Sequence, residues 1–295
     1  MLESASKNKQ GLSMKIVTLL SQSLIISMLI MNSISSKVLI WDLGGVLFKE
    51  NHLGFAHKIG IRRFLAYTFV DKKTPFIEPL IFNILETFGT QQEELSQRVC
   101  TKRGAHIPSI MCDWFSGKKS SLEILEAVNQ RIEELDKERY FISLRQKKLA
   151  QEAVRVMFDP HIIGRHMRPI RKGVKLLKEC AQVSNEDGTK KHTLFVLSNW
   201  DSLSFEVLYE RNPQVFSLFD PKHIVISGRI GLVKPHKNCF QYLIDTYKLT
   251  PELCVFIDDQ EVNVKNAQAF KMTALLVKKG DYKTLRKKLK ELQVL

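Results

Sequence analysis

Polar side chains follow three apolar runs of this sequence, at the point where each run ends. These side chains are Asp42, Ser198 with Asn199, and the pair Asp258–Asp259. An aspartate in such a position can act as a nucleophile towards phosphorus. A serine hydroxyl beside a backbone N–H can bind an oxyanion. Two adjacent carboxylates repel each other unless a cation lies between them, and Mg²⁺ prefers such oxygen ligands.

Lys234 adds a positive charge to this set. It follows a glycine-containing turn predicted at 228–231 and directly precedes Pro235. An ammonium group there can neutralise both crowded carboxylates and a bound phosphate. Taken singly, each of these residues is ordinary, as a turn aspartate, a loop cap or a surface lysine. Their joint occurrence in this order points to one shared site.

The elements that position these residues follow from the hydrophobic pattern. The apolar runs predict strands at 37–41, 193–197, 223–226, 253–257 and 273–277. Amphipathic stretches between them predict helices at 174–180, 202–211, 238–247 and 262–270. Strands that alternate with helices imply an α/β fold with a parallel sheet and helices on both faces. Ligands bind at the carboxyl ends of the strands in such sheets, so the polar residues are expected to converge.

Two other parts of the chain have a different character. Residues 52–165 show helical periodicity and predict a mainly helical insertion, which leaves 37–51 and 166–295 as the core. Within residues 1–36, an apolar stretch at 16–31 follows Lys15 and precedes small residues, which fits a secretory signal peptide. The stretch is shorter than the roughly 20 residues of a membrane span, so no stable span is expected. We expect export to the periplasm or medium if this segment is a signal peptide, and a cytoplasmic protein otherwise.

Composition limits the class of protein and its partners. Apolar residues make up 44% and charged residues 26% of the chain, which excludes wholesale disorder and a multi-span membrane protein. The net charge of +14 favours anionic partners such as phosphorylated metabolites, nucleic acid or an acidic membrane surface. The basic tail at 271–295 carries only one aromatic residue, Tyr282, so stacking on single-stranded nucleic acid is not expected. A solvated basic helix is the simpler interpretation of the tail, and the five cysteines, without CxxC spacing, favour buried thiols.

Together, the four sequence stretches that carry these polar residues resemble the four motifs of the haloacid dehalogenase-like (HAD) hydrolase superfamily. The matching stretches are WDLGGVL at 41–47, LSN at 197–199, GRIGLVKP at 228–235 and FIDDQEVN at 256–263. The resemblance covers 37–295, with a vaguer match in the helical insertion. It implies a Rossmann-like doubly wound parallel sheet core with an inserted α-helical cap, as in the phosphatase-like members of the superfamily.

The resemblance also implies a role for each residue. Asp42 would be the nucleophile, and the residues that would bind the phosphoryl oxygens are Ser198, Asn199 and Lys234. The groups that would hold Mg²⁺ are Asp42, the Gly44 backbone, Asp258 and Asp259, with Asn263 in support. The implied activity is magnesium-dependent hydrolysis of a small phosphorylated metabolite through an aspartyl-phosphate on Asp42.

Gly44 departs from the usual motif, because phosphatases of this superfamily carry a second aspartate there as general acid and base. Losing such a group costs ~10²–10⁴-fold in rate. Replacements in the insertion could be His57, Glu78, Asp113 or His161. Three alternatives stay open: a haloacid hydrolase that needs no metal, a phosphonate hydrolase with a cap lysine, and a binding protein on a catalytically impaired core, which Gly44 supports.

Overall fold

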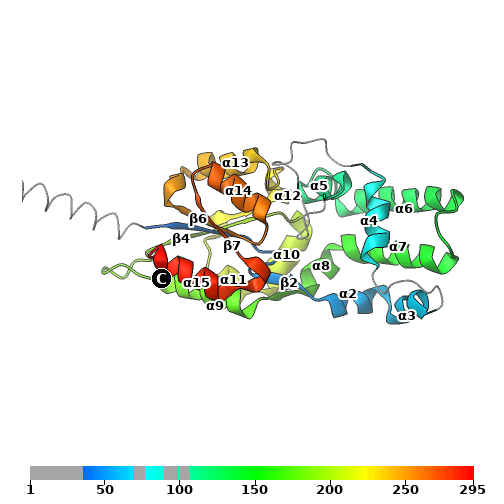
Figure 1. Ribbon diagram of the computed structural model, residues 1–295, viewed down its shortest axis with the longest axis horizontal. Helices are drawn as coiled ribbons and strands as arrows, with labels where there is room; N and C mark the ends of the chain where they lie inside the picture. The colour runs from blue at the N-terminus through cyan, green and yellow to red at the C-terminus, as the bar shows by residue number, and fades with distance from the viewer. Residues whose placement is uncertain (1–35, 70–76, 90–98, 100–105) are drawn as a thin grey trace, which may run out of the picture.

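A five-stranded parallel sheet forms the centre of the protein (Figure 1). The computed structural model describes residues 36–69, 77–89, 99 and 106–295. The strand order is β5-β4-β1-β6-β7, and every neighbouring pair is parallel. The strands are β1 (Val38–Trp41), β4 (Thr193–Ser198), β5 (Ile224–Ile226), β6 (Cys254–Asp258) and β7 (Thr273–Leu276). The predicted α/β class is confirmed, and β1 lies in the middle of the sheet.

Helices cover both faces of the sheet, as the alternation of elements predicts. Leu39 and Trp41 of β1 belong to one hydrophobic cluster, while Ile40 between them belongs to another. Successive side chains of a strand point to opposite faces, so β1 contributes to both layers. The first layer contains α9 (Arg171–Gln182), α10 (Ser202–Arg211), α11 (Pro213–Phe216) and α15 (Tyr282–Glu291), and the second contains α13 (Lys237–Tyr247) and α14 (Glu261–Ala269).

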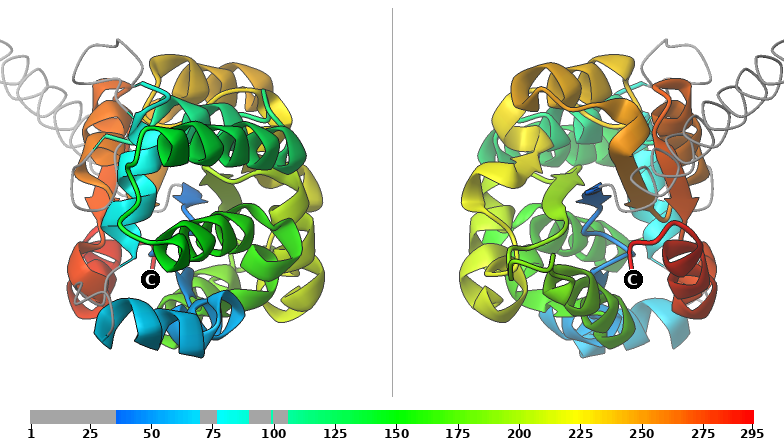
Figure 2. Two further views of the ribbon diagram at one scale, coloured as in Figure 1. Left: turned by 90° about the vertical axis from the view of Figure 1, so that its right-hand side faces the viewer. Right: turned by 90° about the vertical axis from the view of Figure 1, so that its left-hand side faces the viewer.

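A separate helical bundle extends beyond the carboxyl ends of the strands (Figure 1) and faces the viewer in the left-hand view of Figure 2. Its helices are α2 (His52–Ile59), α3 (Ile61–Phe69), α4 (Glu78–Glu86), α5 (Ser109–Phe115), α6 (Ser121–Lys137), α7 (Leu144–Phe158) and α8 (Pro160–His166). The bundle has its own hydrophobic cluster, which includes Ile84, Ile124 and Phe158. Ser120 and Glu123 form a reciprocal capping box at the start of α6. The helical insertion is therefore present, while the division into domains at 52–165 stays a prediction.

The structure also contains elements that the hydrophobic pattern does not predict. β2 (Phe48–Glu50) and β3 (Met167–Pro169) pair antiparallel where the chain enters and leaves the helical bundle. Three residues are too few to show a strand period, so this ribbon has no sequence signal. The turn predicted at 228–231 is instead mostly the short helix α12 (Ser227–Ile230), and His223 ends a 3₁₀ turn rather than beginning a strand.

Several predictions concern segments or properties outside the sheet. The apolar stretch at 16–31 lies outside the described residues, so the proposed signal peptide stays a prediction. Among the described helices, none combines the length and the apolar character needed to cross a bilayer. The described cysteines, Cys112, Cys180, Cys239 and Cys254, are buried, and burial raises the pKa of Cys239 to about 12.

Candidate active site

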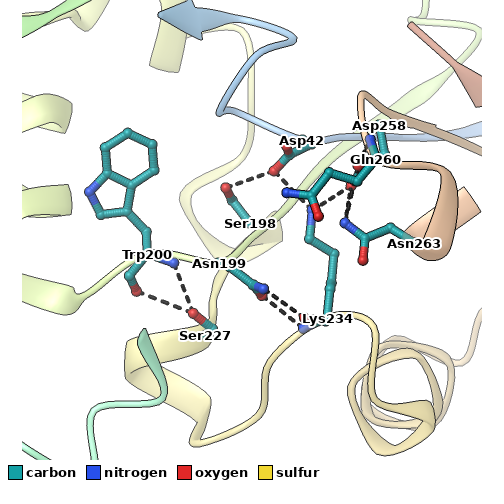
Figure 3. Close-up of polar contacts among 9 residues, drawn as sticks. All are labelled: Asp42, Ser198, Asn199, Trp200, Ser227, Lys234, Asp258, Gln260 and Asn263. Carbon is teal, nitrogen blue, oxygen red and sulfur yellow. Dashed lines mark hydrogen bonds and ion pairs between the residues drawn. The ribbon is translucent and has the colours of Figure 1, made fainter. Parts of the chain in front are cut away.

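The strand ends bring the predicted residues together at one edge of the sheet (Figure 3). Asp42 directly follows β1, Ser198 is the last residue of β4, and Asp258 is the last residue of β6. β1 pairs with both β4 and β6, and Trp41 lies opposite Val196 and Ile257. This register places the three polar side chains side by side at the carboxyl ends of neighbouring strands.

Asp42 is buried and receives two donors on the same oxygen. The Ser198 hydroxyl donates to Asp42 Oδ1 at 2.8 Å, and Lys234 Nζ lies 2.9 Å from that oxygen. Asp42 keeps 6% of its surface exposed. Within the described residues, therefore, Oδ2 is the oxygen left for a metal ion or for attack on a substrate.

Lys234 is the positive centre of the site. Its side chain is only 2% exposed, and Nζ contacts Asp258 Oδ2 at 2.7 Å as well as Asp42. Burial alone would lower the pKa of this ammonium, but the Asp258 and Asp42 carboxylates hold it above its ordinary value. Lys234 is thus a permanently charged group that holds two carboxylates in place.

Asp258 is saturated with hydrogen-bond donors. Oδ1 accepts the Gln260 backbone N–H at 2.8 Å, Oδ2 accepts Lys234, and the Asn263 amide donates to both oxygens at 3.1 Å. An ionised carboxylate has about four lone-pair positions, and all four are engaged here. The expected support by Asn263 takes the form of bracing Asp258.

Asn199 lies beside the site, but its side chain is committed elsewhere. The Asn199 amide donates to the Lys234 carbonyl at 2.7 Å and accepts the Lys234 N–H at 2.8 Å. This two-bond pairing fixes the backbone that carries Lys234. The Asn199 side chain is therefore a positioning group in this geometry, and only its backbone N–H is left for the predicted contact with a phosphoryl oxygen.

Three carboxylates form a group that can hold a metal ion. Asp42, Asp258 and Asp259 each offer an oxygen, and these oxygens lie within 4.8 Å of one another. Burial raises the pKa of Asp42 to about 7. The positive charge of Lys234 opposes this shift, and the negative charges of Asp258 and Asp259 add to it. One ammonium does not balance three clustered carboxylates, and an all-oxygen donor set suits Mg²⁺. The residues present therefore fit the cation that the sequence predicts.

The raised pKa of Asp42 predicts how magnesium stabilises the fold. Because the folded state holds the Asp42 proton more tightly than the unfolded chain, the metal-free protein loses stability as pH rises from about 4 to about 7. Mg²⁺ competes with that proton, so its stabilising effect should grow over the same range. Thermal melts with EDTA and with saturating Mg²⁺ at about pH 5.5 and about pH 8 measure this. In Asp42→Asn, the stabilisation by Mg²⁺ should no longer increase with pH. If Mg²⁺ stabilises the wild type equally at both pH values, Asp42 is not the group whose proton Mg²⁺ displaces.

The turn after Asp42 is held by backbone bonds and by the C-terminal helix. Gly45 donates its N–H to the Phe48 carbonyl at 2.7 Å, and the Tyr282 hydroxyl donates to the Val46 carbonyl at 2.6 Å. Gly45 has φ +77°, a conformation that favours glycine, whereas Gly44 is not in the left-handed region. A Cβ added at Gly44 would meet nothing within 4 Å. Gly44 therefore has room for a side chain without backbone strain, because the neighbouring Gly45 supplies the positive φ of the turn.

The helical bundle touches the core next to the site. Ser227 accepts the Trp200 N–H at 2.9 Å and donates to the Phe115 carbonyl at 2.6 Å. Val233, directly before Lys234, packs in a small cluster with Cys112 of α5. No local sequence pattern marks Tyr282, Ser227 or Trp200 for the site, because their contacts depend on how separate segments pack.

The four acid/base candidates of the insertion lie on the helical bundle. His57, Glu78 and His161 are exposed, and Asp113 lies 3.7 Å from Lys119. His161 lines a surface pocket of about 550 Å³ between α8 and α10. Within the described residues none of the four hydrogen bonds to Asp42, so the structure names no replacement for the acid missing at Gly44.

Comparison with known proteins gives distant similarities. No protein-family model matches the chain. Bifunctional epoxide hydrolase 2 of Rattus norvegicus is 31% identical over 88 residues, which is 29% of this chain and 16% of that protein. The Mus musculus protein of the same name is 31% identical over 87 residues, 29% of this chain and 15% of that protein. The chain thus spans about a sixth of the length of these relatives.

Solved structures with a similar arrangement belong to HAD enzymes. A HAD-family enzyme of Bacteroides thetaiotaomicron, also solved with magnesium and inorganic phosphate, has a TM-score of 0.49 at 16% identity and covers 85% of this chain and 98% of its own. A predicted HAD-like hydrolase of Porphyromonas gingivalis has a TM-score of 0.47 at 18% identity, covering 86% and 97%. L-2-haloacid dehalogenase of Xanthobacter autotrophicus has a TM-score of 0.46 at 15% identity, covering 86% and 82%. At this distance, an activity must be argued from the side chains of the chain itself.

Proposed function

We propose that the protein is a magnesium-dependent HAD-type hydrolase that cleaves a small phosphate monoester through an aspartyl-phosphate on Asp42. The observation that carries the proposal is the cluster of three carboxylates, Asp42, Asp258 and the half-buried Asp259, of which the two buried ones pair with the ammonium of Lys234. A site with this charge distribution suits a cation and a phosphoryl group better than an uncharged substrate. The order of motifs along the sequence supports the same conclusion.

The reaction follows from the groups that face the site. A carboxylate oxygen of Asp42 attacks phosphorus, and the bond between phosphorus and the leaving oxygen breaks with its electron pair on that oxygen. Lys234 Nζ and the Ser198 hydroxyl, which both contact Asp42 Oδ1, hold the carboxylate in one orientation and lie close enough to bind phosphoryl oxygens. Water then attacks the phosphorus of the aspartyl-phosphate, which releases phosphate and restores Asp42.

Magnesium would be held by Asp42 and Asp259, with Asp258 acting through water because its lone pairs are already engaged. The ion would offset negative charge on the transferring phosphoryl group. The half-buried Asp259 follows β6 directly, so its backbone is fixed by the sheet. Removal of Mg²⁺ with EDTA is expected to abolish turnover.

A second candidate function, hydrolysis of a carbon–halogen bond, is favoured by Gly44. A halide leaves without a proton, so such an enzyme needs no acid at that position. The clustered carboxylates speak against it, because a metal-free site would have to tolerate their repulsion. Phosphate release from a panel of phosphorylated metabolites, and halide release from short 2-haloacids, each with Mg²⁺ and with EDTA, tests both. Halide release that EDTA leaves unchanged would overturn the phosphatase proposal.

Gly44→Asp is expected to raise turnover on alkyl phosphates. The new carboxyl would enter open space beside Asp42 and can protonate a poor leaving group, a function worth ~10²–10⁴-fold. Aryl phosphates, whose leaving groups need little protonation, should gain less. Steady-state rates on alkyl and aryl phosphates of similar size measure the difference.

Gly45→Asp is the matched control for this substitution. It adds the same side chain one residue later, where φ +77° makes a Cβ strained by about 1–2 kcal/mol. We expect a lower melting temperature and no gain in rate. A folded Gly44→Asp enzyme without a gain on alkyl phosphates would mean that another group already supplies the proton.

A further inference from the structure

Two neighbouring helices carry half of the net charge of the protein. α9 and α15 together contain nine lysines and arginines but only two glutamates, a net charge of +7 against +14 for the whole chain. The two helices contact each other along the same face of the sheet (Figure 1), and Arg286 of α15 pairs with Glu179 of α9. Half of the net charge is therefore gathered on one surface.

The cations of this surface point outward. The inner sides of the two helices are apolar, with Leu177 of α9 and Leu285 and Leu289 of α15 buried in the core. The exposed cations are Arg171, Lys172, Lys175 and Lys178 of α9, and Lys283, Lys287, Lys288 and Lys290 of α15. Both glutamates are engaged, Glu179 by Arg286 and Glu291 by Lys287 at 3.7 Å. We call this surface, made by the outward cations of α9 and α15, the basic face.

The chain enters the described structure close to one end of the basic face. Ser36 donates to the Lys191 carbonyl at 2.5 Å, and Lys191 Nζ lies 3.4 Å from the Gln293 carbonyl just after α15. His192 accepts the Lys37 N–H and contacts the Val294 carbonyl at 3.1 Å. The apolar sequence at 16–31 thus precedes a residue that is tied to the C-terminal end of the basic face.

We propose that the basic face docks on an anionic lipid surface. One membrane-binding element alone gives only marginal attachment to a bilayer, whereas an apolar segment combined with a basic patch gives stable attachment. The entry point of the chain lies at the amino end of β1, and Asp42 lies at its carboxyl end, so attachment there leaves the candidate active site open. The only aromatic side chain of α15, Tyr282, is buried, so the basic face presents no ring from α15 for stacking on nucleic-acid bases.

Vesicle co-sedimentation of the full chain tests the proposal. We expect binding to vesicles of phosphatidylcholine mixed with phosphatidylglycerol, weaker binding to phosphatidylcholine alone, and loss of the difference at high salt. Each lysine near an anionic surface contributes roughly 5-fold in partition coefficient, so the triple variant Lys172→Gln, Lys175→Gln, Lys178→Gln should bind about 100-fold less.

The matched control removes the same charge elsewhere. The triple variant Lys137→Gln, Lys222→Gln, Lys248→Gln changes three exposed lysines outside the basic face and should keep wild-type binding. Equal melting temperatures of the two variants would show that neither effect comes from misfolding. Equal losses in both triple variants, equal binding to neutral and anionic vesicles, or binding to RNA without binding to vesicles would each overturn the proposal.

Discussion

Asp42→Asn is expected to reduce turnover by on the order of 10⁴–10⁶-fold, since loss of a nucleophile that acts together with neighbouring catalytic groups has effects of this size. The amide nearly matches the carboxylate in shape, so its oxygen can still accept the Ser198 hydroxyl at the 2.8 Å contact. An amide is a poor nucleophile and cannot form the acyl-phosphate. Steady-state rates of purified variant and wild type measure the loss.

Two further measurements separate loss of chemistry from loss of structure. Asp42→Asn removes a buried carboxylate that the fold holds at a raised pKa, so its metal-free melting temperature at neutral pH should equal or exceed that of the wild type. Asp245→Asn, the same substitution at an exposed position of α13, should keep full activity. Acid-quenched wild-type enzyme should carry a phosphoryl group on the peptide that contains Asp42. Turnover that survives in Asp42→Asn would exclude the aspartyl-phosphate route.

Lys234→Met is expected to destabilise the metal-free protein by about 3–5 kcal/mol, because it leaves two buried carboxylates without their cation. Lys234 Nζ contacts Asp42 at 2.9 Å and Asp258 at 2.7 Å, and all three side chains are buried. Lys234 Nζ lies 5.5 Å from the centroid of the Phe256 ring, and methionine removes this charge while keeping much of the apolar stem of lysine. Urea unfolding in EDTA measures the free energy of unfolding, and activity should be lost in parallel.

Magnesium and a second substitution distinguish this electrostatic effect from a packing defect. Mg²⁺ should restore part of the stability of Lys234→Met, because it replaces the missing positive charge among the same carboxylates. Adding Asp258→Asn should also recover stability, since it removes one of the unpaired charges. A loss that neither Mg²⁺ nor Asp258→Asn relieves would assign the effect to packing alone.

The sequence predicts the sheet and the strand-end residues because both depend on local patterns. Runs such as 193–197 and 253–257 are long enough to show a buried strand, and a parallel sheet then brings Ser198 and Asp258 to one edge. The two-bond pairing of Asn199 with Lys234 has no such signal, since it joins residues 35 positions apart through a side chain. The same holds for Tyr282, which reaches Val46 across 236 positions from a helix whose sequence shows only a basic surface.

The two glycines that follow Asp42 and Leu43 show a detail of the turn that the sequence alone does not determine. Two adjacent glycines indicate a turn, but the sequence does not tell which of them adopts positive φ. Gly45 has that conformation, and Gly44 beside it has room for a side chain. Whether Gly44 can be replaced by a residue that donates a proton thus depends on the backbone conformation of the turn, which the residue pattern does not show.

The central position of β1 has a consequence for how the protein is made. β1 pairs with β4 and β6, and Asp42 and Ser198, which are in contact in the folded protein, are 156 positions apart. At about 5–20 residues per second, a ribosome needs roughly 8–30 s to synthesise the chain between them. During that time the nascent strand Val38–Trp41, apolar and unpaired on both edges, has no native partner. Asp42, the proposed nucleophile, is therefore translated before the other residues of the candidate site and stays longest without its native neighbours.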